Sequence, residues 1–155
     1  MGLIIRRENL KQLVDIVHQQ GKTVVATNGC FDILHVGHVK YLQKTKSFAD
    51  VSIILLNSDS SVRLIKGPNR PINNEKDRAE LLCALACVDY VVLFNEVSPR
   101  ALLDEMKPDV YTKGGDYTME NLPEADIMKK NGTRVEFIKF IDGKSTTNIL
   151  DKINQ

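Results

Sequence analysis

The chain contains 155 residues, of which 43% are hydrophobic and 26% are charged, a size and composition that suit one globular domain with its own core. Its 21 Lys and Arg residues nearly balance its 20 Asp and Glu residues, so the overall charge favours neither a nucleic-acid partner nor an anionic membrane surface. Because the apolar run at residues 3–5 is too short for a signal peptide and no stretch approaches the roughly 20 apolar residues of a membrane-spanning helix, we expect a single cytoplasmic domain over residues 1–155.

The first half of the chain alternates between helical and extended patterns. Apolar residues recur at helical spacing over residues 10–20 and stop at Gly21, which predicts an amphipathic helix that ends at a glycine. Runs rich in β-branched residues predict buried strands over residues 23–27 and 51–56. A helical pattern over residues 39–45 connects them, so this part forms a strand-helix-strand unit.

The second half continues the alternation. The pattern predicts a helix from about Asn74 to Cys87, a strand over 90–94, a helix with Ser98 as its N-cap, a strand over 110–112, a helix over 124–130, a strand over 135–138 and a helix over 146–153. Together these elements predict an α/β fold: a Rossmann-like, five-stranded parallel sheet with helices on both faces.

The three cysteines are expected to be free thiols. An odd number cannot pair completely, and a chain of this size and apolar content does not need a disulfide framework. Cys83 and Cys87 lie four residues apart on a predicted helix, a spacing that suits either a metal site or two small core residues. No other Cys or His lies near them in the sequence, which favours the core.

Unusual residues gather where predicted strands end, which is where parallel α/β sheets bind ligands. Directly after the first strand of the strand-helix-strand unit comes His35-Val36-Gly37-His38, at the start of a helix. Histidines three residues apart at a helix start lie on one face, Gly37 keeps that face open, and the helix N-terminus adds backbone N–H groups that attract phosphate. The alternative is that both histidines only make hydrogen bonds within a polar loop. His18, on the polar side of the first helix, is expected to be a solvated surface residue.

This segment resembles the signature of the His-x-Gly-His nucleotidyltransferase superfamily, with matches from Gly29 to Asp32 and at His35 and His38. Further motifs resemble the D-glycero-D-manno-heptose 1-phosphate adenylyltransferases over nearly the whole chain. These motifs are the loop Lys66-Gly67 to Arg70-Pro71, the run Lys113-Gly114-Gly115-Asp116-Tyr117, and the run Asp142-Gly143-Lys144-Ser145-Thr146-Thr147. The resemblance implies transfer of AMP from ATP to a heptose 1-phosphate with release of pyrophosphate, by a stand-alone form without a fused kinase domain.

The resemblance also assigns roles to residues of this chain. His35, His38 and Lys66 are expected to be catalytic. Nucleotide contacts are expected from the two histidines and from Gly29, Cys30, Phe31, Gly37, Arg78, Gly114, Asp116, Ser145, Thr146 and Thr147. Contacts with the acceptor are expected from Asn28, Asp32, Asp59, Lys66 and Lys113.

Some of these residues have simpler explanations that stay open at this point. Lys66, Arg70 and Arg78 suit either a mobile cationic loop that closes over phosphates or ordinary solvated charges. Asp59 and Asp116 suit either a ligand or the stabilisation of a loop, and Ser145 suits an N-cap whether or not it also binds phosphate. Cys30 stands where Thr or Val is common in the family, which matters little if only its backbone is used.

The resemblance further implies Mg²⁺ held mainly by the phosphates of ATP, direct in-line displacement without a covalent intermediate, and a homodimer. The nearest alternative is a glycerol-3-phosphate cytidylyltransferase. In that family an arginine usually stands three residues before the glycine that corresponds to Gly143, where this chain has Phe140. A non-catalytic nucleotide-binding module is an alternative of another class.

Overall fold

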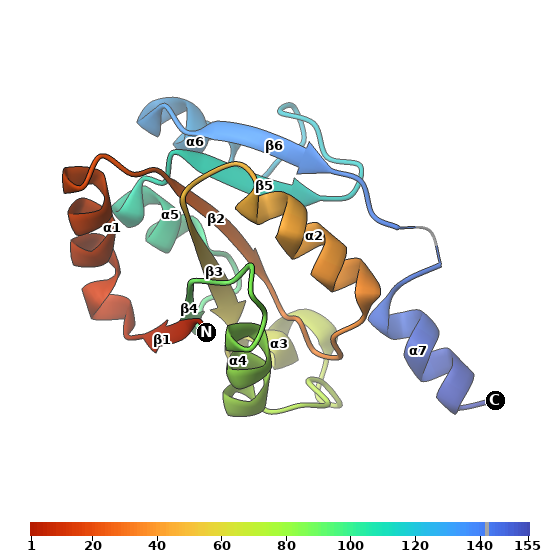
Figure 1. Ribbon diagram of the computed structural model, residues 1–155. Helices are drawn as coiled ribbons and strands as arrows, with labels where there is room; N and C mark the ends of the chain where they lie inside the picture. The colour runs from red at the N-terminus through yellow and green to blue at the C-terminus, as the bar shows by residue number, and fades with distance from the viewer. Residues whose placement is uncertain (142) are drawn as a thin grey trace.

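The computed structural model describes residues 1–141 and 143–155, so Asp142 of the last motif lies outside the described residues. The described strands form one fully parallel sheet in the order β1-β4-β3-β2-β5-β6 (Figure 1). They span Leu3–Ile5 (β1), Val24–Gly29 (β2), Val51–Asn57 (β3), Tyr90–Phe94 (β4), Val110–Gly114 (β5) and Arg134–Ile138 (β6). The predicted α/β fold is confirmed, with six strands in place of five.

The additional strand is β1, at the edge of the sheet. Its three residues pair with β4 in the register Leu3 to Tyr90 and Ile5 to Val92. Leu3 and Ile4 are both more than half exposed, so this strand is held by edge pairing more than by burial. Three apolar residues give too little periodicity to predict a strand without knowledge of the partner.

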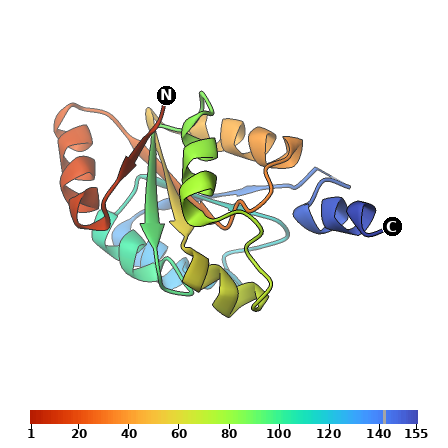
Figure 2. The same cartoon turned by 90° about the horizontal axis from the view of Figure 1, so that it is seen from below.

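Helices cover both faces of the sheet, as Figures 1 and 2 show. They span Leu10–Gln19 (α1, after the 3-10 turn η1, Arg7–Asn9), Val36–Lys46 (α2), Asp59–Lys66 (α3), Glu75–Cys83 (α4), Arg100–Met106 (α5), Ala125–Asn131 (α6) and Thr146–Ile153 (α7). Helices α1, α5 and α6 share one apolar core with β2 and β5, whereas α2 and α4 share a second core with β3 and β4. Helix α7 projects from the edge of the molecule and buries no residue.

Three local predictions were wrong. No helix was predicted between residues 57 and 73, but residues 59–66 form α3 because Ser58 accepts a hydrogen bond from the Ser61 N–H and buried Val62 anchors the helix. Helix α4 begins after Asn74 as expected but ends at Cys83, four residues early. At α5 the N-cap position is Pro99, and the Ser98 hydroxyl accepts only a long hydrogen bond, 3.4 Å, from the Arg100 N–H.

The order of the strands places a ligand-binding crevice at the end of β2. The chain runs from β2 to β3 on one side, then crosses to β5 on the other side of β2. Buried hydroxyls fix α2 over this point: Tyr41 hydrogen bonds with Thr27 at 2.6 Å, and Thr45 hydrogen bonds with Thr112 at 2.9 Å. The start of α2 is therefore held over the carboxyl ends of β2 and β5, where ligands of such sheets bind.

Candidate active site

The two histidines of the His-x-Gly-His motif cap helix α2. His35 is the N-cap, and its Nδ1 accepts a hydrogen bond of 3.1 Å from the Gly37 N–H. His38 reaches back with its own Nδ1 to the His35 N–H at 3.4 Å. This reciprocal pattern is a capping box built from imidazoles. It fixes both rings against the backbone at the mouth of the crevice.

These contacts define which nitrogen of each histidine can act on a ligand. Because Nδ1 of each ring accepts a backbone hydrogen, the proton of the neutral ring lies on Nε2. The rings stack with their centroids 3.9 Å apart. Burial, aided by neighbouring His35 and Lys66, lowers the pKa of His38 to about 4. Burial, followed by the charge of Lys144, also lowers the pKa of His35. Both rings are therefore neutral Nε2–H donors at neutral pH.

Two glycines make room for these rings. A Cβ on Gly37 would lie 2.8 Å from Cε1 and 2.9 Å from Nδ1 of His35. The absence of a side chain at Gly37 therefore leaves room for the His35 ring, in addition to keeping open the helix face that carries both histidines. A Cβ on Gly29 would lie 2.8 Å from the ring of Phe31. That ring packs edge-on against His38 at 5.3 Å, and Phe31 adopts a left-handed backbone with φ of 45°, a strained conformation typical of functional sites.

A cavity of about 890 Å³ opens in front of the histidines. It lies at the ends of β2 and β5 and extends to the start of α7. The structure places fourteen of the predicted residues on its wall: Asn28, Gly29, Cys30, Phe31, Asp32, His35, Gly37, His38, Lys66, Lys113, Gly114, Ser145, Thr146 and Thr147. Three predicted residues do not line it: Asp59, Arg78 and Asp116.

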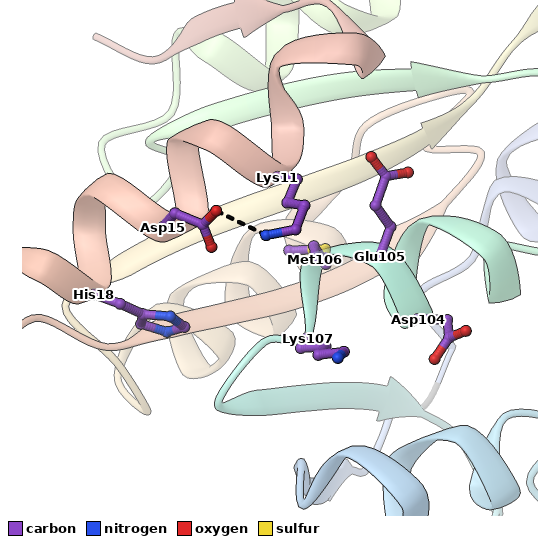
Figure 3. Close-up of a pocket in the computed structure, with 7 residues that line it drawn as sticks. All are labelled: Lys11, Asp15, His18, Asp104, Glu105, Met106 and Lys107. Carbon is purple, nitrogen blue, oxygen red and sulfur yellow. Dashed lines mark hydrogen bonds and ion pairs between the residues drawn. The ribbon is translucent and has the colours of Figure 1, made fainter.

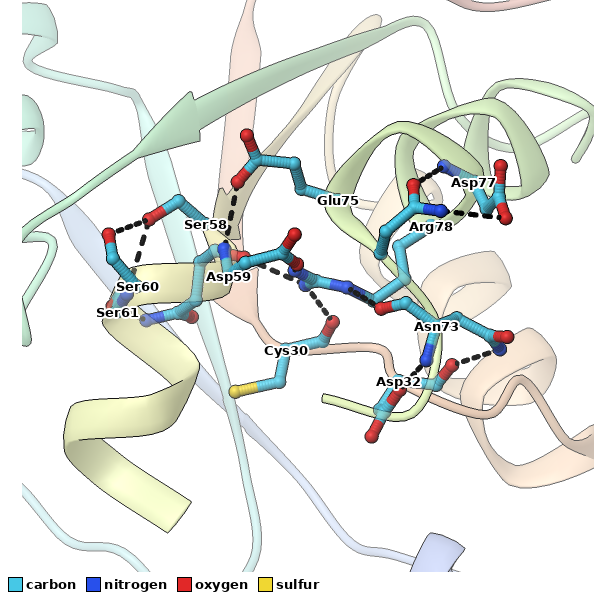
Figure 4. A network of polar contacts seen from close by, with 12 residues as sticks. Cys30, Asp32, Ser58, Asp59, Ser60, Ser61, Asn73, Glu75, Asp77 and Arg78 are labelled. Atoms are coloured by element: carbon cyan, nitrogen blue, oxygen red, sulfur yellow. Dashed lines mark hydrogen bonds and ion pairs between the residues drawn. The ribbon is translucent and has the colours of Figure 1, made fainter. Parts of the chain in front are cut away.

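Arg78 is a buried clamp in this structure, in contrast to the mobile surface cation that was expected. Its side chain is fully buried. The guanidinium donates to the Cys30 carbonyl at 2.8 Å, to the Asn57 carbonyl at 2.7 Å and to the Asp59 carboxylate at 2.8 Å (Figure 4). A fourth hydrogen bond, from Nε, reaches the Asn73 carbonyl at 2.9 Å. Arg78 thus ties the ends of β2 and β3 to α3 and to the loop before α4.

Asp32 performs a similar task for the loop before α4. It is 2% exposed, and its carboxylate accepts hydrogen bonds from the Ile72 and Asn73 N–H groups and from Nε of Arg70, all at 2.8–2.9 Å. Although burial acts to raise the pKa of Asp32, these donors lower it below the ordinary range. Asp32 lines the cavity, but its hydrogen bonds are already made within the protein.

The start of α7 forms another wall of the cavity. Ser145 is the N-cap and accepts the Asn148 N–H at 3.0 Å, so the capping role is confirmed. Thr146 donates to the Ile33 carbonyl at 3.3 Å, which joins α7 to the β2–α2 connection. Thr147 is exposed at the cavity wall.

Phe140 covers Gly114 at the end of β5. Gly114 was expected to contact the nucleotide, but the ring of Phe140 lies against it, where a Cβ would overlap with the ring. Phe140 is 66% exposed and lines the cavity. Asp116 lies in the connection that follows β5, is exposed, and does not line the cavity.

Other residues of the cavity were missed by sequence reasoning. Lys144 belongs to the last motif but had no predicted role, although its charge helps to lower the pKa of His35. Tyr117 packs under the Lys113 ammonium, 5.1 Å from ring centre to Nζ. Glu124 is 3% exposed and also lines the cavity. It lies at the start of a short helix, where a Glu is common, so no pattern in the sequence distinguishes it.

A second, smaller hollow of about 320 Å³ lies between α1 and α5 (Figure 3). It contains the Lys11–Asp15 ion pair and His18, which hydrogen bonds with Asp109 at 2.8 Å. His18 is exposed as expected, but this hydrogen bond also joins α1 to the start of β5. None of the residues that line this hollow is a predicted site residue.

Among the described residues, no group of three or more His, Cys, Asp or Glu side chains is placed to hold a metal ion. The three cysteines are free thiols, and Cys83 is buried in the core. Within residues 1–141 and 143–155, no helix combines the length and apolar character needed to cross a membrane.

Comparison with known proteins agrees with this geometry. A family model described as cytidylyltransferase-like matches residues 26–149. The chain is 52% identical to the bifunctional protein HldE of Syntrophotalea carbinolica, over 95% of this chain and 30% of that protein. It is 53% identical to the bifunctional protein HldE of Geobacter metallireducens, over 94% of this chain and 30% of that protein. The chain thus spans about a third of the length of these relatives.

One solved structure extends the comparison to three dimensions. A lipopolysaccharide core biosynthesis protein from Thermoplasma volcanium matches 78% of this chain and 98% of its own chain. The TM-score is 0.63 and the sequence identity is 32%. The two proteins therefore share the same fold over the matched part of the chain.

Proposed function

Because this chain belongs to the cytidylyltransferase-like family, we propose that it is a nucleotidyltransferase that transfers AMP from ATP to D-glycero-D-manno-heptose 1-phosphate. The observation that carries the proposal is the stacked pair of neutral Nε2–H donors, His35 and His38, at the start of α2. The heptose phosphate is supported by the motifs from Lys66 to Pro71, from Lys113 to Tyr117 and from Gly143 to Thr147.

The reaction follows from the placement of charge around the cavity. A phosphate oxygen of the sugar phosphate attacks the α-phosphorus of ATP, and the bond from that phosphorus to the oxygen bridging to the β-phosphate breaks. Pyrophosphate leaves with the electron pair of that bond. Negative charge grows on the oxygens around the α-phosphorus, where two fixed Nε2–H donors stabilise it without a proton transfer.

The lysines supply the positive charge that the neutral histidines lack. Lys66 lies at the end of α3, Lys113 near the end of β5 and Lys144 before α7, so they approach the cavity from three sides. We assign Lys66 and Lys144 to the triphosphate and Lys113 to the acceptor phosphate. Arg78 and Asp59 act indirectly, because they fix the strand ends that carry Asn28, Gly29 and Cys30.

Mg²⁺ fits this site as an ion carried by its substrate. The charged groups that converge on the cavity are mainly ammonium groups, and Asp32 already accepts three donors. Mg²⁺ would therefore be held by phosphate oxygens and water, where it neutralises charge on the leaving pyrophosphate. A single domain over residues 1–155, a homodimer and a cytoplasmic location stay predictions.

Pyrophosphate release in the presence of Mg²⁺ tests the proposal. ATP and CTP are each combined with D-glycero-D-manno-heptose 1-phosphate and with glycerol 3-phosphate. Release only from ATP and the heptose phosphate supports it, and release only from CTP and glycerol 3-phosphate makes the chain a glycerol-3-phosphate cytidylyltransferase. Nucleotide binding in calorimetry without release from any pair would instead indicate a non-catalytic module.

A variant of His38 tests the assigned mechanism. His38→Ala removes one of the two donors, so turnover should fall by about 10²-fold or more. Its melting temperature should fall by less than about 4 °C, because the variant loses the 3.4 Å cap that His38 makes with the His35 N–H, which is worth about 1 kcal/mol. Near-normal turnover in a folded variant would refute the assignment.

A further inference from the structure

Glu124 is a buried carboxylate that the chemistry above does not use. It immediately precedes α6 and lies on the wall of the cavity. The residue is 3% exposed, and its Oε2 has no hydrogen-bond partner among the described residues. Its other oxygen, Oε1, lies 4.0 Å from Nζ of Lys113, which is too far for a hydrogen bond.

The groups around Glu124 include Lys113, which the proposed function assigns to the acceptor phosphate. Lys113 projects from the end of β5 beside it. Tyr111 lies on the same strand and donates a hydrogen bond of 2.5 Å to Oδ1 of Asn28, at the end of β2. Burial, followed by the negative charge of Glu124, raises the pKa of Tyr111, so Tyr111 stays a neutral donor. Tyr111 thus links Asn28 to the strand that carries Lys113, and Asn28, Lys113 and Glu124 all line the cavity.

A buried carboxylate oxygen without a donor is energetically unfavourable. Loss of hydration of a charged group is repaid only by hydrogen bonds or by a close ion pair. Lys113 supplies charge at 4.0 Å but no hydrogen bond. Asp32 shows the contrast within the same cavity, because its carboxylate is saturated by the Arg70 side chain and two backbone N–H groups.

The missing donors define the chemistry of the ligand. A phosphate would be repelled by the carboxylate, whereas neutral hydroxyl groups can donate to it. An ammonium beside a carboxylate suits a ligand that carries a phosphate close to free hydroxyls. A sugar phosphate has both groups at this spacing.

From this geometry we infer that Glu124 is a specificity-determining residue, whose carboxylate accepts hydrogen bonds from hydroxyl groups of the sugar phosphate acceptor beside the Lys113 ammonium. The inference deepens the proposed function and rests on it. It separates two tasks within one ion pair: Lys113 holds the acceptor phosphate, and Glu124 selects a hydroxylated acceptor.

The test compares Glu124→Gln and Glu124→Leu with the control Glu120→Gln, an exposed Glu of the same connection. Both Glu124 variants should raise the KM for the heptose phosphate about tenfold or more, because bonds to a charged acceptor are lost. The KM for ATP and the Mg²⁺ concentration for half-maximal activity should change less than about twofold. Glu120→Gln should match the wild type in each measurement.

Thermal unfolding without substrate separates this role from a structural one. Because Glu124 lacks a hydrogen-bond partner within the described residues, its removal should leave the melting temperature equal or raise it. A lower melting temperature together with equal losses for both substrates would make Glu124 structural and overturn the inference. A raised Mg²⁺ requirement with an unchanged KM for the acceptor would make it a metal ligand, with the same consequence.

The activity of the wild type separates a failure of the proposed function from a failure of the role of Glu124 alone. If it releases no pyrophosphate from ATP and the heptose phosphate, the proposed function fails, and the inference fails with it. If the wild type is active and Glu124→Gln has a normal KM for the acceptor, the inference alone is refuted.

Discussion

Gly37→Ala should inactivate the protein without unfolding it, because the new methyl group collides with a catalytic ring and not with the core. The added Cβ would lie 2.8 Å from Cε1 of His35 and 3.2 Å from Cβ of Lys144. The ring of His35 must therefore turn away, and it loses the 3.1 Å hydrogen bond from the residue 37 N–H. Displacement of one fixed donor costs about 10²–10³-fold in turnover.

The same change should be nearly neutral for stability. Alanine is favoured over glycine within a helix by about 0.5–1 kcal/mol, and the lost cap costs about 1 kcal/mol. For a chain of this size the melting temperature should then shift by less than about 4 °C. Pyrophosphate release and thermal unfolding measure the two effects on the same preparation.

A double variant identifies the cause of the loss. If alanine at position 37 acts through His35, it should have little further effect in a His35→Ala background, so the two losses should not add. An equal loss in both backgrounds would refute this explanation and indicate that the change acts through Lys144 or the backbone. Wild-type turnover in Gly37→Ala would show that the position of the His35 ring is unimportant.

Three further predictions concern neighbouring residues. Since burial lowers the pKa of His38 to about 4, from about 6.5 in the unfolded chain, the unfolded state gains a proton first as the pH falls. Stability should therefore decline from pH 6.5 towards 4, and the melting temperature should decline less over this range in His38→Gln; parallel profiles would contradict the shift. Arg78→Met should lower the free energy of unfolding in urea by about 3–5 kcal/mol, whereas Arg63→Met, at an exposed site on α3, should change it by less than about 0.5 kcal/mol; equal effects would refute the clamp. Burial raises the pKa of the Cys30 thiol, so iodoacetamide should label it slowly at pH 7.5. Cys30→Ala should keep its activity; a loss of activity would show that the side chain itself contacts substrate.

The motif around His35 and His38 could be predicted because its meaning is local. The three-residue spacing, the glycine between the histidines and the preceding strand are all present in the sequence, and α2 needs no distant residue to place both rings on one face. Helix α3 was missed for the opposite reason. Its eight residues contain few apolar positions, and its cap depends on how Ser58 is held after β3.

Arg78 and Glu124 mark the limit of sequence reasoning more sharply. Charged residues are rarely fully buried unless they are paired, so a solvent-facing or ligand-facing role is the natural expectation for both. Arg78, for example, is held by hydrogen bonds to Cys30 and Asn57, which lie 48 and 21 positions away in the sequence. No pattern along the chain records such contacts, so these two roles required the structure.

The charged residues that line the cavity or support its wall form two groups with different tasks. Asp32 accepts a hydrogen bond from the Asn73 N–H, and Arg78 donates one to the Cys30 carbonyl. Both residues therefore shape the strand ends before any substrate binds. The Lys66 side chain lines the cavity, and Glu124 has a carboxylate oxygen without a hydrogen-bond partner within the described part of the chain. Variants of the first group should therefore change stability and activity together, whereas variants of Lys66 or Glu124 should change substrate kinetics without loss of stability. The histidines belong to both groups, because Nδ1 of each ring caps α2 while Nε2 is left for the substrate.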